Sequence, residues 1–249
     1  IQDSGEDGIS GVTIQLKDAG GNVIGTTTTD SSGNYSFEVT AGTYSIGITP
    51  PAGYVVSPLD QGSNDAADSD IDPATNMSAN VTVAAGETNN TLDAGLYRLA
   101  QLGDRVWLDE NGNGQQDGGE AGKSGVTVNL LNNAGAIVAT QTTDSNGNYL
   151  FTDLIPGTYS VEFVAPSGFE FTVKDSGADA SDSDADPATG KTGTYTLQSG
   201  DDNRTVDAGL KLIPQPAFIG DRVWEDKNAN GIQDSGEDGI SGVTIQLKD

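Results

Sequence analysis

The chain repeats itself, and this periodicity constrains its fold more than any other feature of the sequence. The segment GDRVW at 103–107 returns at 220–224, which is 117 positions later. DSSGNY at 30–35 and DSNGNY at 144–149 lie 114 positions apart. A unit of about 115 residues has the size of one ordinary domain. The sequence therefore predicts tandem domains, with a first repeat at 1–100, a complete second repeat at 101–217 and the start of a third at 218–249.

The first and last segments of the chain are identical to each other. IQDSGEDGISGVTIQLKD occupies 1–18 and again 232–249, whereas the middle copy at 115–132 matches only 10 of the 18 positions. Identity that extends to freely variable positions indicates duplication of a two-repeat unit of 231 residues. We therefore expect a window of a longer array, in which the first repeat lacks its N-terminal strand and half of a loop.

The pattern within each repeat is that of an all-β fold. Short stretches alternate apolar and polar residues and are separated by turns, many of them marked by the chain's 34 glycines. Strands at this spacing are typical of a β-sandwich. The strands expected in the second repeat are 104–107, 126–131, 137–142, 149–153, 157–163, 169–173, 193–197 and 205–208, with short connecting segments at 97–102 and 211–217.

The charge of the chain favours a cationic ligand and excludes several classes of function. Thirty-seven acidic residues against 11 basic ones leave a net charge of −26, which repels itself in a compact fold. Such a surface is unsuited to nucleic acid, whose phosphates are bound by Lys and Arg. The absence of Cys and His disfavours zinc sites and nucleophile–His catalysis, and no apolar run is long enough to insert in a membrane.

One loop matches the twelve-residue calcium-binding pattern position by position. In DENGNGQQDGGE, at 109–120, oxygen side chains fall at positions 1, 3, 5, 9 and 12, a glycine at 6 and a backbone carbonyl at 7. The sequence after this loop has the pattern of a strand, not of a helix. The alternative interpretation of the loop is a solvated turn made of Asn, Gly and Asp residues. The expected Ca²⁺ ligands are Asp109, Asn111, Asn113, Gln115, Asp117 and Glu120; in the next copy Asp226, Asn228, Asn230, Ile232, Asp234 and Glu237; and in the opening half-copy Ile1, Asp3 and Glu6.

A second acidic segment occurs in both repeats with its four aspartates equally spaced. Carboxylates this close repel one another unless a cation neutralises them, although a mobile acidic loop is the alternative. The expected ligands are Asp65, Asp68, Asp70 and Asp72 in the first repeat and Asp179, Asp182, Asp184 and Asp186 in the second. The turn residues Asp30 and Asp144 are either further ligands or ordinary turn formers. Weaker candidates are Asp93, Asp207, Asp104 and Asp221.

These motifs resemble a known family, the SdrD-type B repeats of serine-aspartate-repeat surface adhesins, which are related to collagen-adhesin B domains. The resemblance rests on GDRVWLDENGNGQQDGGE, SGVTVNLLN, TTDSNGNYLFTDLIPGTYSVEF, PSGFEF, SDSDADPATG and TVDAGL, in this order. It implies prealbumin-like or Ig-like β-sandwiches, stabilised by calcium at the 109–120 and 226–237 loops, that form a stalk on a bacterial surface. The identical ends suggest a longer array or filament.

The predicted function is thus structural: a calcium-stabilised repeat of an extracellular adhesin stalk or filament, in contact with neighbouring repeats. Catalysis is not expected, because the clustered carboxylates have metal-loop spacing and no aromatic-lined cleft accompanies them. Two alternatives stay open. The repeats themselves could bind a carbohydrate or protein, or the chain could be a self-assembling fibre subunit whose 218–249 tail completes a domain of the next molecule.

Overall fold

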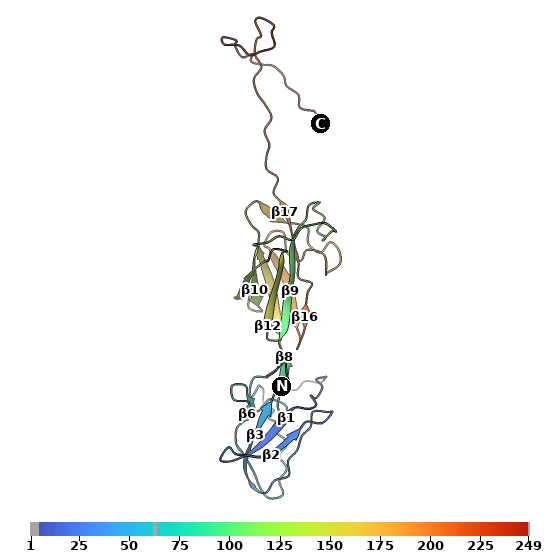
Figure 1. Cartoon of the computed structure of the whole chain (residues 1–249), viewed down its shortest axis with the longest axis vertical. Coiled ribbons are helices and arrows are strands. Elements are labelled where there is room, and N and C mark those ends of the chain that lie inside the picture. The colour runs from blue at the N-terminus through green and yellow to red at the C-terminus, as the bar shows by residue number, and fades with distance from the viewer. Residues whose placement is uncertain (1–4, 62–63, 249) are drawn as a thin grey trace. The chain divides into compact units, whose positions relative to one another are not determined.

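The computed structural model describes residues 5–61 and 64–248, and these contain strands and turns but no helix. The chain divides into two compact units, Ile1–Leu212 and Ile213–Asp249. The first unit holds two repeats, whose strands are drawn in Figure 1. The all-β class predicted from the sequence is confirmed.

The second repeat is a sandwich of two sheets. One sheet has the order β11-β10-β13-β15; the other has the order β12-β9-β17-β14, with β16 beside β9. The strands are β9 (Ala100–Leu108), β10 (Thr127–Asn132), β11 (Ile137–Thr142), β12 (Asn148–Leu154), β13 (Gly157–Val164), β14 (Phe169–Phe171), β15 (Lys191–Leu197), β16 (Asp202–Asn203) and β17 (Ala208–Leu212).

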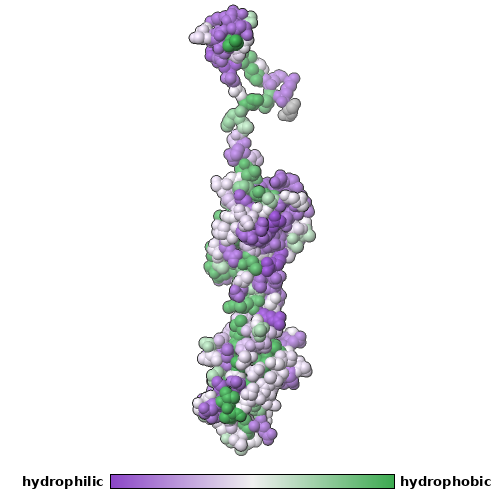
Figure 2. All heavy atoms as spheres, viewed as in Figure 1, coloured by the Kyte–Doolittle hydropathy of each residue, from purple (hydrophilic) through white to green (hydrophobic). Residues whose placement is uncertain are grey.

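The core of the second repeat lies between these sheets. Inward side chains such as Leu130 and Phe163 from one sheet meet Leu102, Val106 and Tyr149 from the other, and all are buried. Tyr149 packs edge-on against Phe163, with ring centroids 5.6 Å apart. In Figure 2 a broad area of hydrophilic residues lies on the face of this repeat that is turned to the viewer.

Strand β9 holds the second sheet together. It pairs antiparallel with β12 on one side, and parallel with β17 and β16 on the other. The register with β17 sets Ala208 opposite Val106 and Leu210 opposite Leu108. The first and last long strands of the repeat are therefore neighbours.

The first repeat has a smaller core around Val12, Ile14, Ile46, Ile48 and Ile71. Its main sheet has the order β2-β1-β3-β6-β5, with β7 beside β3, and a separate two-stranded sheet joins β4 and β8. The strands are β1 (Thr13–Asp18), β2 (Val23–Thr28), β3 (Gly42–Thr49), β4 (Tyr54–Val56), β5 (Ile71–Asp72), β6 (Met77–Ser78), β7 (Val81–Val83) and β8 (Leu96–Arg98).

The structure differs from the sequence-based expectation at the connection between repeats. The segment 97–102 was expected to be a linker, but Ala100 and Leu102 are fully buried in β9. Arg98 in β8 donates its backbone N–H to Ser199 Oγ at 2.8 Å. The connection is therefore short because its residues complete strands on both sides.

The unit 213–249 contains no named strand in its described residues, and its one isolated bridge joins Trp224 to Gly239. Phe218 and Ile219 are almost fully exposed, at 94% and 87%.

Candidate functional site

The 109–120 loop is organised around Asp109, which is buried at the end of β9. Its Oδ1 accepts the backbone N–H groups of Gly112 and Asn113 at 2.6 and 3.2 Å, and its Oδ2 accepts that of Gly114 at 2.7 Å and the Thr172 hydroxyl. Burial alone would raise the pKa of Asp109, but these hydrogen bonds outweigh it and hold that pKa below its ordinary value. Asp109 is therefore ionised, and it holds the loop in place through these hydrogen bonds.

The side chains at loop positions 3, 5 and 9 converge. Asn111 and Asn113 each donate an amide N–H to Asp117 Oδ2, at 2.8 and 2.9 Å. Glu120, at position 12, accepts the backbone N–H of Glu110 at 3.0 Å and that of Asp117 at 2.9 Å. The loop is thus wrapped around its own oxygen-bearing side chains, as the twelve-residue pattern predicts.

The loop at 226–237 repeats this bonding in the second unit. Asp226 Oδ2 accepts the Gly231 N–H at 2.7 Å, and Asn228 and Asn230 both donate to Asp234 Oδ2 at 2.8 Å. Glu237 accepts the backbone N–H groups of Lys227 and Asp234, each at 2.9 Å. In the half-copy at the start of the chain, Ile1 and Asp3 lie outside the described residues, and Glu6 is exposed.

The second acidic segment packs against the 109–120 loop. The backbone of Gln116 donates to Ser181 O at 2.7 Å, and Ser183 donates to Gly114 O at 3.1 Å. The Gln115 side chain also reaches Ser176 O at 3.1 Å. The two loops that the sequence singled out separately are therefore one structural region.

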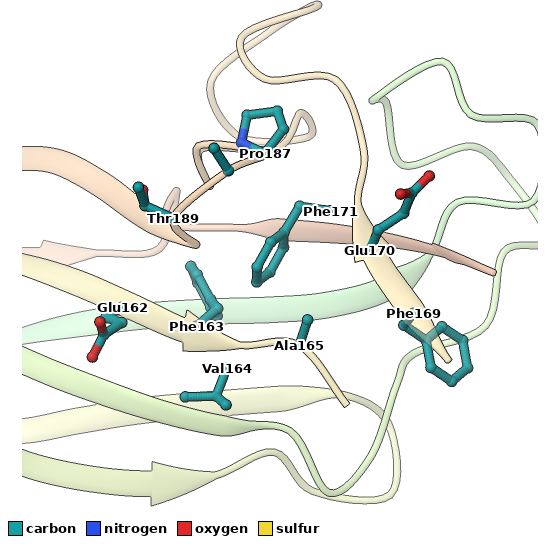
Figure 3. A pocket seen from close by; sticks show the side chains of 10 residues that line it. Glu162, Phe163, Val164, Ala165, Phe169, Glu170, Phe171, Pro187 and Thr189 are labelled. Atoms are coloured by element: carbon teal, nitrogen blue, oxygen red, sulfur yellow. The ribbon is translucent and has the colours of Figure 1, made fainter. Parts of the chain in front are cut away.

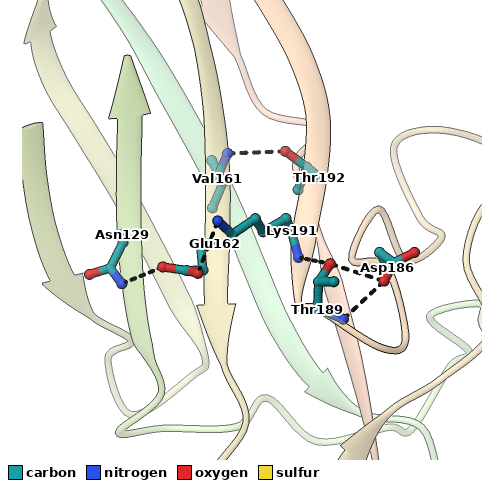
Figure 4. Close-up of polar contacts among 7 residues, drawn as sticks. All are labelled: Asn129, Val161, Glu162, Asp186, Thr189, Lys191 and Thr192. Atoms are coloured by element: carbon teal, nitrogen blue, oxygen red, sulfur yellow. Dashed lines mark hydrogen bonds and ion pairs between the residues drawn. The ribbon is translucent and has the colours of Figure 1, made fainter. Parts of the chain in front are cut away.

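The four aspartates of this second segment do not converge on a point. Asp182 and Asp184 are buried, and burial raises the pKa of Asp184 to about 6. Asp179 is exposed, and Asp186 accepts the N–H and hydroxyl of Thr189 in a local turn (Figure 4). The first repeat follows a similar division: Asp68 is buried, Asp70 is half-buried and accepts the Asp93 N–H, Asp65 is exposed, and Asp72 accepts the Ala74 N–H in a turn.

The turn residues Asp30 and Asp144 have local partners. Asp30 Oδ1 accepts the N–H groups of Ser32 and Asn34 at 2.8 and 2.9 Å, and Asp144 makes the same bonds to Asn146 and Asn148. These hydrogen bonds lower the pKa of both carboxyl groups. Both residues act as turn formers.

Across residues 5–61 and 64–248, no three acidic side chains form a ready-made metal cluster. At its predicted ligand positions, each twelve-residue loop instead combines three carboxylates with asparagine amides and backbone groups. Sequence reasoning missed Thr172, which donates to Asp109 from 63 positions away, because nothing local marks it.

A groove of about 420 Å³ lies beside β13 and β14 (Figure 3). It is lined by Phe163, Val164, Phe169, Phe171 and residues 187–189, with Glu162 and Glu170 at its margin. Glu162 is already engaged, because it accepts from Asn129 at 3.1 Å and pairs with Lys191 at 3.5 Å (Figure 4). Glu170 pairs with Lys211 at 3.3 Å, so both carboxylates beside the groove have cationic partners.

Comparison with known proteins assigns the family. A family model described as "SdrD B-like domain" matches residues 1–96, 100–210 and 217–249. The chain belongs to the SdrD B-like domain family. Its SdrD B-like modules are structural, not enzymatic, and the family resemblance seen in the sequence is confirmed.

Two relatives are similar to the SdrD B-like modules over the whole chain. Serine-aspartate repeat-containing protein D of Staphylococcus aureus (strain Newman) is 44% identical over 254 residues, and serine-aspartate repeat-containing protein F of Staphylococcus epidermidis is 42% identical over 257. The chain spans only 18% and 14% of the lengths of these relatives.

The solved structures to which the chain is similar include two pilins. The minor pilin GBS52 of Streptococcus agalactiae is 15% identical with a TM-score of 0.34, and the alignment covers 89% of this chain and 91% of that one. The shaft pilin spaA of Lactobacillus rhamnosus GG is 13% identical with a TM-score of 0.33, over 86% of this chain and 91% of that one.

No helix among the described residues is long and apolar enough to cross a membrane.

Proposed function

We propose that the chain is a calcium-stabilised structural segment of an extracellular bacterial adhesin stalk or surface filament. The observation that carries the proposal is the bonding pattern of the twelve-residue loop, which recurs at 109–120 and 226–237. In both, the side chains at positions 3 and 5 converge on the carboxylate at position 9, and the position-12 glutamate closes the loop.

The chemistry of this side-chain set suits calcium. Calcium takes six to eight oxygen ligands from carboxylates, amide carbonyls, backbone carbonyls and water, in a flexible shell. Asp117 now receives two amide N–H groups, and turning those amides would present their oxygens to the same point. A bound ion would also reduce the self-repulsion of a chain with a net charge of −26.

The extracellular location is part of the proposal. It rests on the family and on the names of the relatives, which describe longer serine-aspartate repeat-containing proteins. Within such a protein these modules would contact neighbouring repeats of the same kind and serve as spacers.

The decisive experiment is thermal unfolding of the chain with calcium and after removal of calcium by EDTA. An ion that binds only the folded state adds about 2.7 kcal/mol of stability at a concentration one hundred times its Kd. We expect Asp109→Asn to remove most of the calcium-dependent rise in Tm of the second repeat. Asp153→Asn is the matched control, because it removes one exposed charge away from the loop. A Tm that is the same with calcium and with EDTA contradicts the proposal.

The binding-module alternative has one supporting observation, the groove beside Phe169 and Phe171. It predicts that the calcium-loaded chain binds defined glycans or proteins and that Phe169→Ala abolishes this binding. Retention of binding in that variant argues against the groove as the binding site.

A further inference from the structure

Strand β11 forms an open edge of the sandwich in the second repeat. It stands at the end of its sheet and, among the described residues, pairs with β10 alone. Thr143, directly after β11, exchanges backbone hydrogen bonds with Gly125 and Val126 at 3.1 and 3.0 Å. Because neighbouring residues of a strand direct their backbone groups to opposite sides, Thr140 and Thr142 present their N–H and C=O groups away from β10. The edge therefore offers these donors and acceptors to another strand.

The strands at the other three ends of the two sheets carry a charge or are covered. β15 begins at Lys191, which pairs with Glu162 at 3.5 Å, and β14 has Glu170 at its centre. At β12, the Gln141 side chain binds both backbone groups of Leu150: its Nε2 donates to Leu150 O at 2.6 Å, and its Oε1 accepts the Leu150 N–H at 3.1 Å. Charges and covering groups of this kind prevent edge-to-edge pairing. β11 is therefore the edge that is left open.

The segment that contains β11 is neutral in a strongly acidic chain. Residues 133–143 include no charged side chain and no proline, whereas the whole chain has a net charge of −26. Two copies of such a chain repel each other, and the repulsion is smallest where neither copy presents a charge. Ile137 and Val138, at the start of the strand, are 55% and 52% exposed. A second copy of this chain can therefore approach β11 and bury apolar surface there.

The first repeat has an edge of the same kind. β2 ends its sheet and, within the described part of the chain, pairs with β1 alone. Residues 19–29 also include no charged side chain. Val23 and Ile24 are 50% and 54% exposed, and they lie 114 positions before Ile137 and Val138. A neutral edge with two exposed apolar residues is thus a recurring feature of the module.

We propose that β11 pairs antiparallel with β11 of a second copy of this chain, and that β2 pairs with β2 of another copy in the same way. Two identical strands in an antiparallel pair are related by a two-fold axis, so each contact is made twice. The modules would then associate side by side through their sheet edges. This inference does not depend on calcium binding by the twelve-residue loops.

The geometry of an antiparallel pair determines which residues meet. With Thr140 at the centre, the Thr140 residues of the two copies lie opposite each other and exchange both of their backbone hydrogen bonds. Val138 then lies opposite the second copy's Thr142. Apolar surface that is open in the single chain becomes covered by the second copy.

The first experiment measures self-association of the full chain by sedimentation velocity over a range of protein concentrations. We expect the parent to associate, and the double variant Ile24→Lys, Val138→Lys to do so with a Kd that is higher by about tenfold or more, because lysine on an edge strand opposes pairing. The matched control Ile155→Lys, Val164→Lys adds the same two charges at similarly exposed apolar positions outside β2 and β11, and it should associate like the parent. Raising NaCl from about 10 mM to about 0.15 M shortens the Debye length from about 30 to about 8 Å, so association should strengthen.

The second experiment tests the pairing of the strands directly. The chain has no cysteine, so a single introduced cysteine reports only on its own position. In the proposed pair the two Cα atoms of residue 140 lie about 5.5 Å apart, which is within the range that a disulfide spans. Thr140→Cys should therefore form a covalent dimer on mild oxidation, as seen by non-reducing electrophoresis. Thr194→Cys, which is exposed on the β15 edge, should stay monomeric.

Four results overturn the inference. The first is a parent chain that sediments as a monomer at every concentration, and the second is association that is as strong in the Ile24→Lys, Val138→Lys variant as in the parent. The third is association that weakens as salt rises, which would indicate ion pairs. The fourth is equal crosslinking of Thr140→Cys and Thr194→Cys, which would indicate random collision. If circular dichroism shows that the lysine variant does not fold, the two cysteine variants decide.

Discussion

The five residues GDRVW occur twice in this chain and adopt different structures. At 103–107 they lie within β9, and Val106 and Trp107 are completely buried. At 220–224 they form no strand, Val223 is 38% exposed, and Trp224 makes only an isolated bridge to Gly239. Because the five residues are identical in both copies, the difference in structure must come from the residues with which each copy pairs.

The partners of the first copy come from distant parts of the repeat. β12 and β17 flank β9 on its two sides, about 45 and 100 positions away along the chain. Among the described residues of 213–249, the second copy pairs through the bridge between Trp224 and Gly239, and the Arg222 guanidinium donates to Glu237 O at 2.8 Å. The preference of Val and Trp for strands therefore acts only where a pleated, half-buried surface is available.

The largest expected difference between the two copies is in the tryptophans. Trp107→Ala removes a fully buried ring and should destabilise the second repeat by about 3–5 kcal/mol, whereas Trp224→Ala should leave the unfolding of that repeat unchanged. Urea titration followed by far-UV circular dichroism measures both. Equal shifts in the two variants would show that the 220–224 copy is also part of a core.

A smaller difference is expected at the glycines that face these tryptophans. A Cβ on Gly122 would lie 1.7 Å from Asn146 O, whereas one on Gly239 would first meet the flexible end of Arg222 at 3.3 Å. Gly122→Ala should therefore cost about 1–3 kcal/mol through displaced backbone, and Gly239→Ala close to nothing. Calorimetry of the two variants tests this, and a stable Gly122→Ala would mean that the 146–147 turn yields easily.

The smallest expected effect is a difference in pH dependence between the first hairpin turns of the two repeats. Asp18 Oδ1 accepts the N–H groups of Gly20 and Asn22 at 2.9 Å, and Asn132 makes the same turn in the second repeat at 3.0 Å. The hydrogen bonds from Asn22 lower the pKa of Asp18, so its charge stabilises the folded turn above the unfolded pKa of about 3.9, and this contribution is lost as pH falls through the lower folded value.

An NMR titration of the Asp18 carboxyl group should therefore give a pKa below that of a free aspartate. Asp18→Asn should remove the loss of stability at low pH in the first repeat, and Asn132→Asp should introduce such a loss in the second repeat. An ordinary pKa at Asp18 would mean that the turn bonds are too weak in solution to matter.

The sequence predicted correctly those strands that pair with a strand close to them along the chain. The strand expected at 137–142 is β11 with the same bounds, because it is one arm of a hairpin with β10. The strand expected at 205–208 instead begins at Ala208, because Thr205 is held in a turn by Asn203 and the partner of β17 is β9. Parallel pairing with a strand 100 positions away leaves no local signal.

The same limit applies to the candidate sites. The spacing of the twelve-residue loop predicted that positions 3, 5 and 9 would converge, since one tight loop brings them together. Equal spacing in the second acidic segment suggested a single cluster, but Asp186 forms a turn with its neighbours while Asp184 meets Asp207. The hydrogen bond from the Asp207 backbone to Asp184 joins residues 23 positions apart, and nothing in the local spacing predicts it.

The parallel pairing of β9 with β17 also determines how a repeat responds to pulling. Because the two strands run in the same direction, the chain enters the pair at one end and leaves it at the other. A force applied along the polypeptide would load these backbone hydrogen bonds in shear, all at once, instead of opening them one after another. We therefore expect the second repeat to resist extension in force spectroscopy more strongly than its thermal stability alone would suggest.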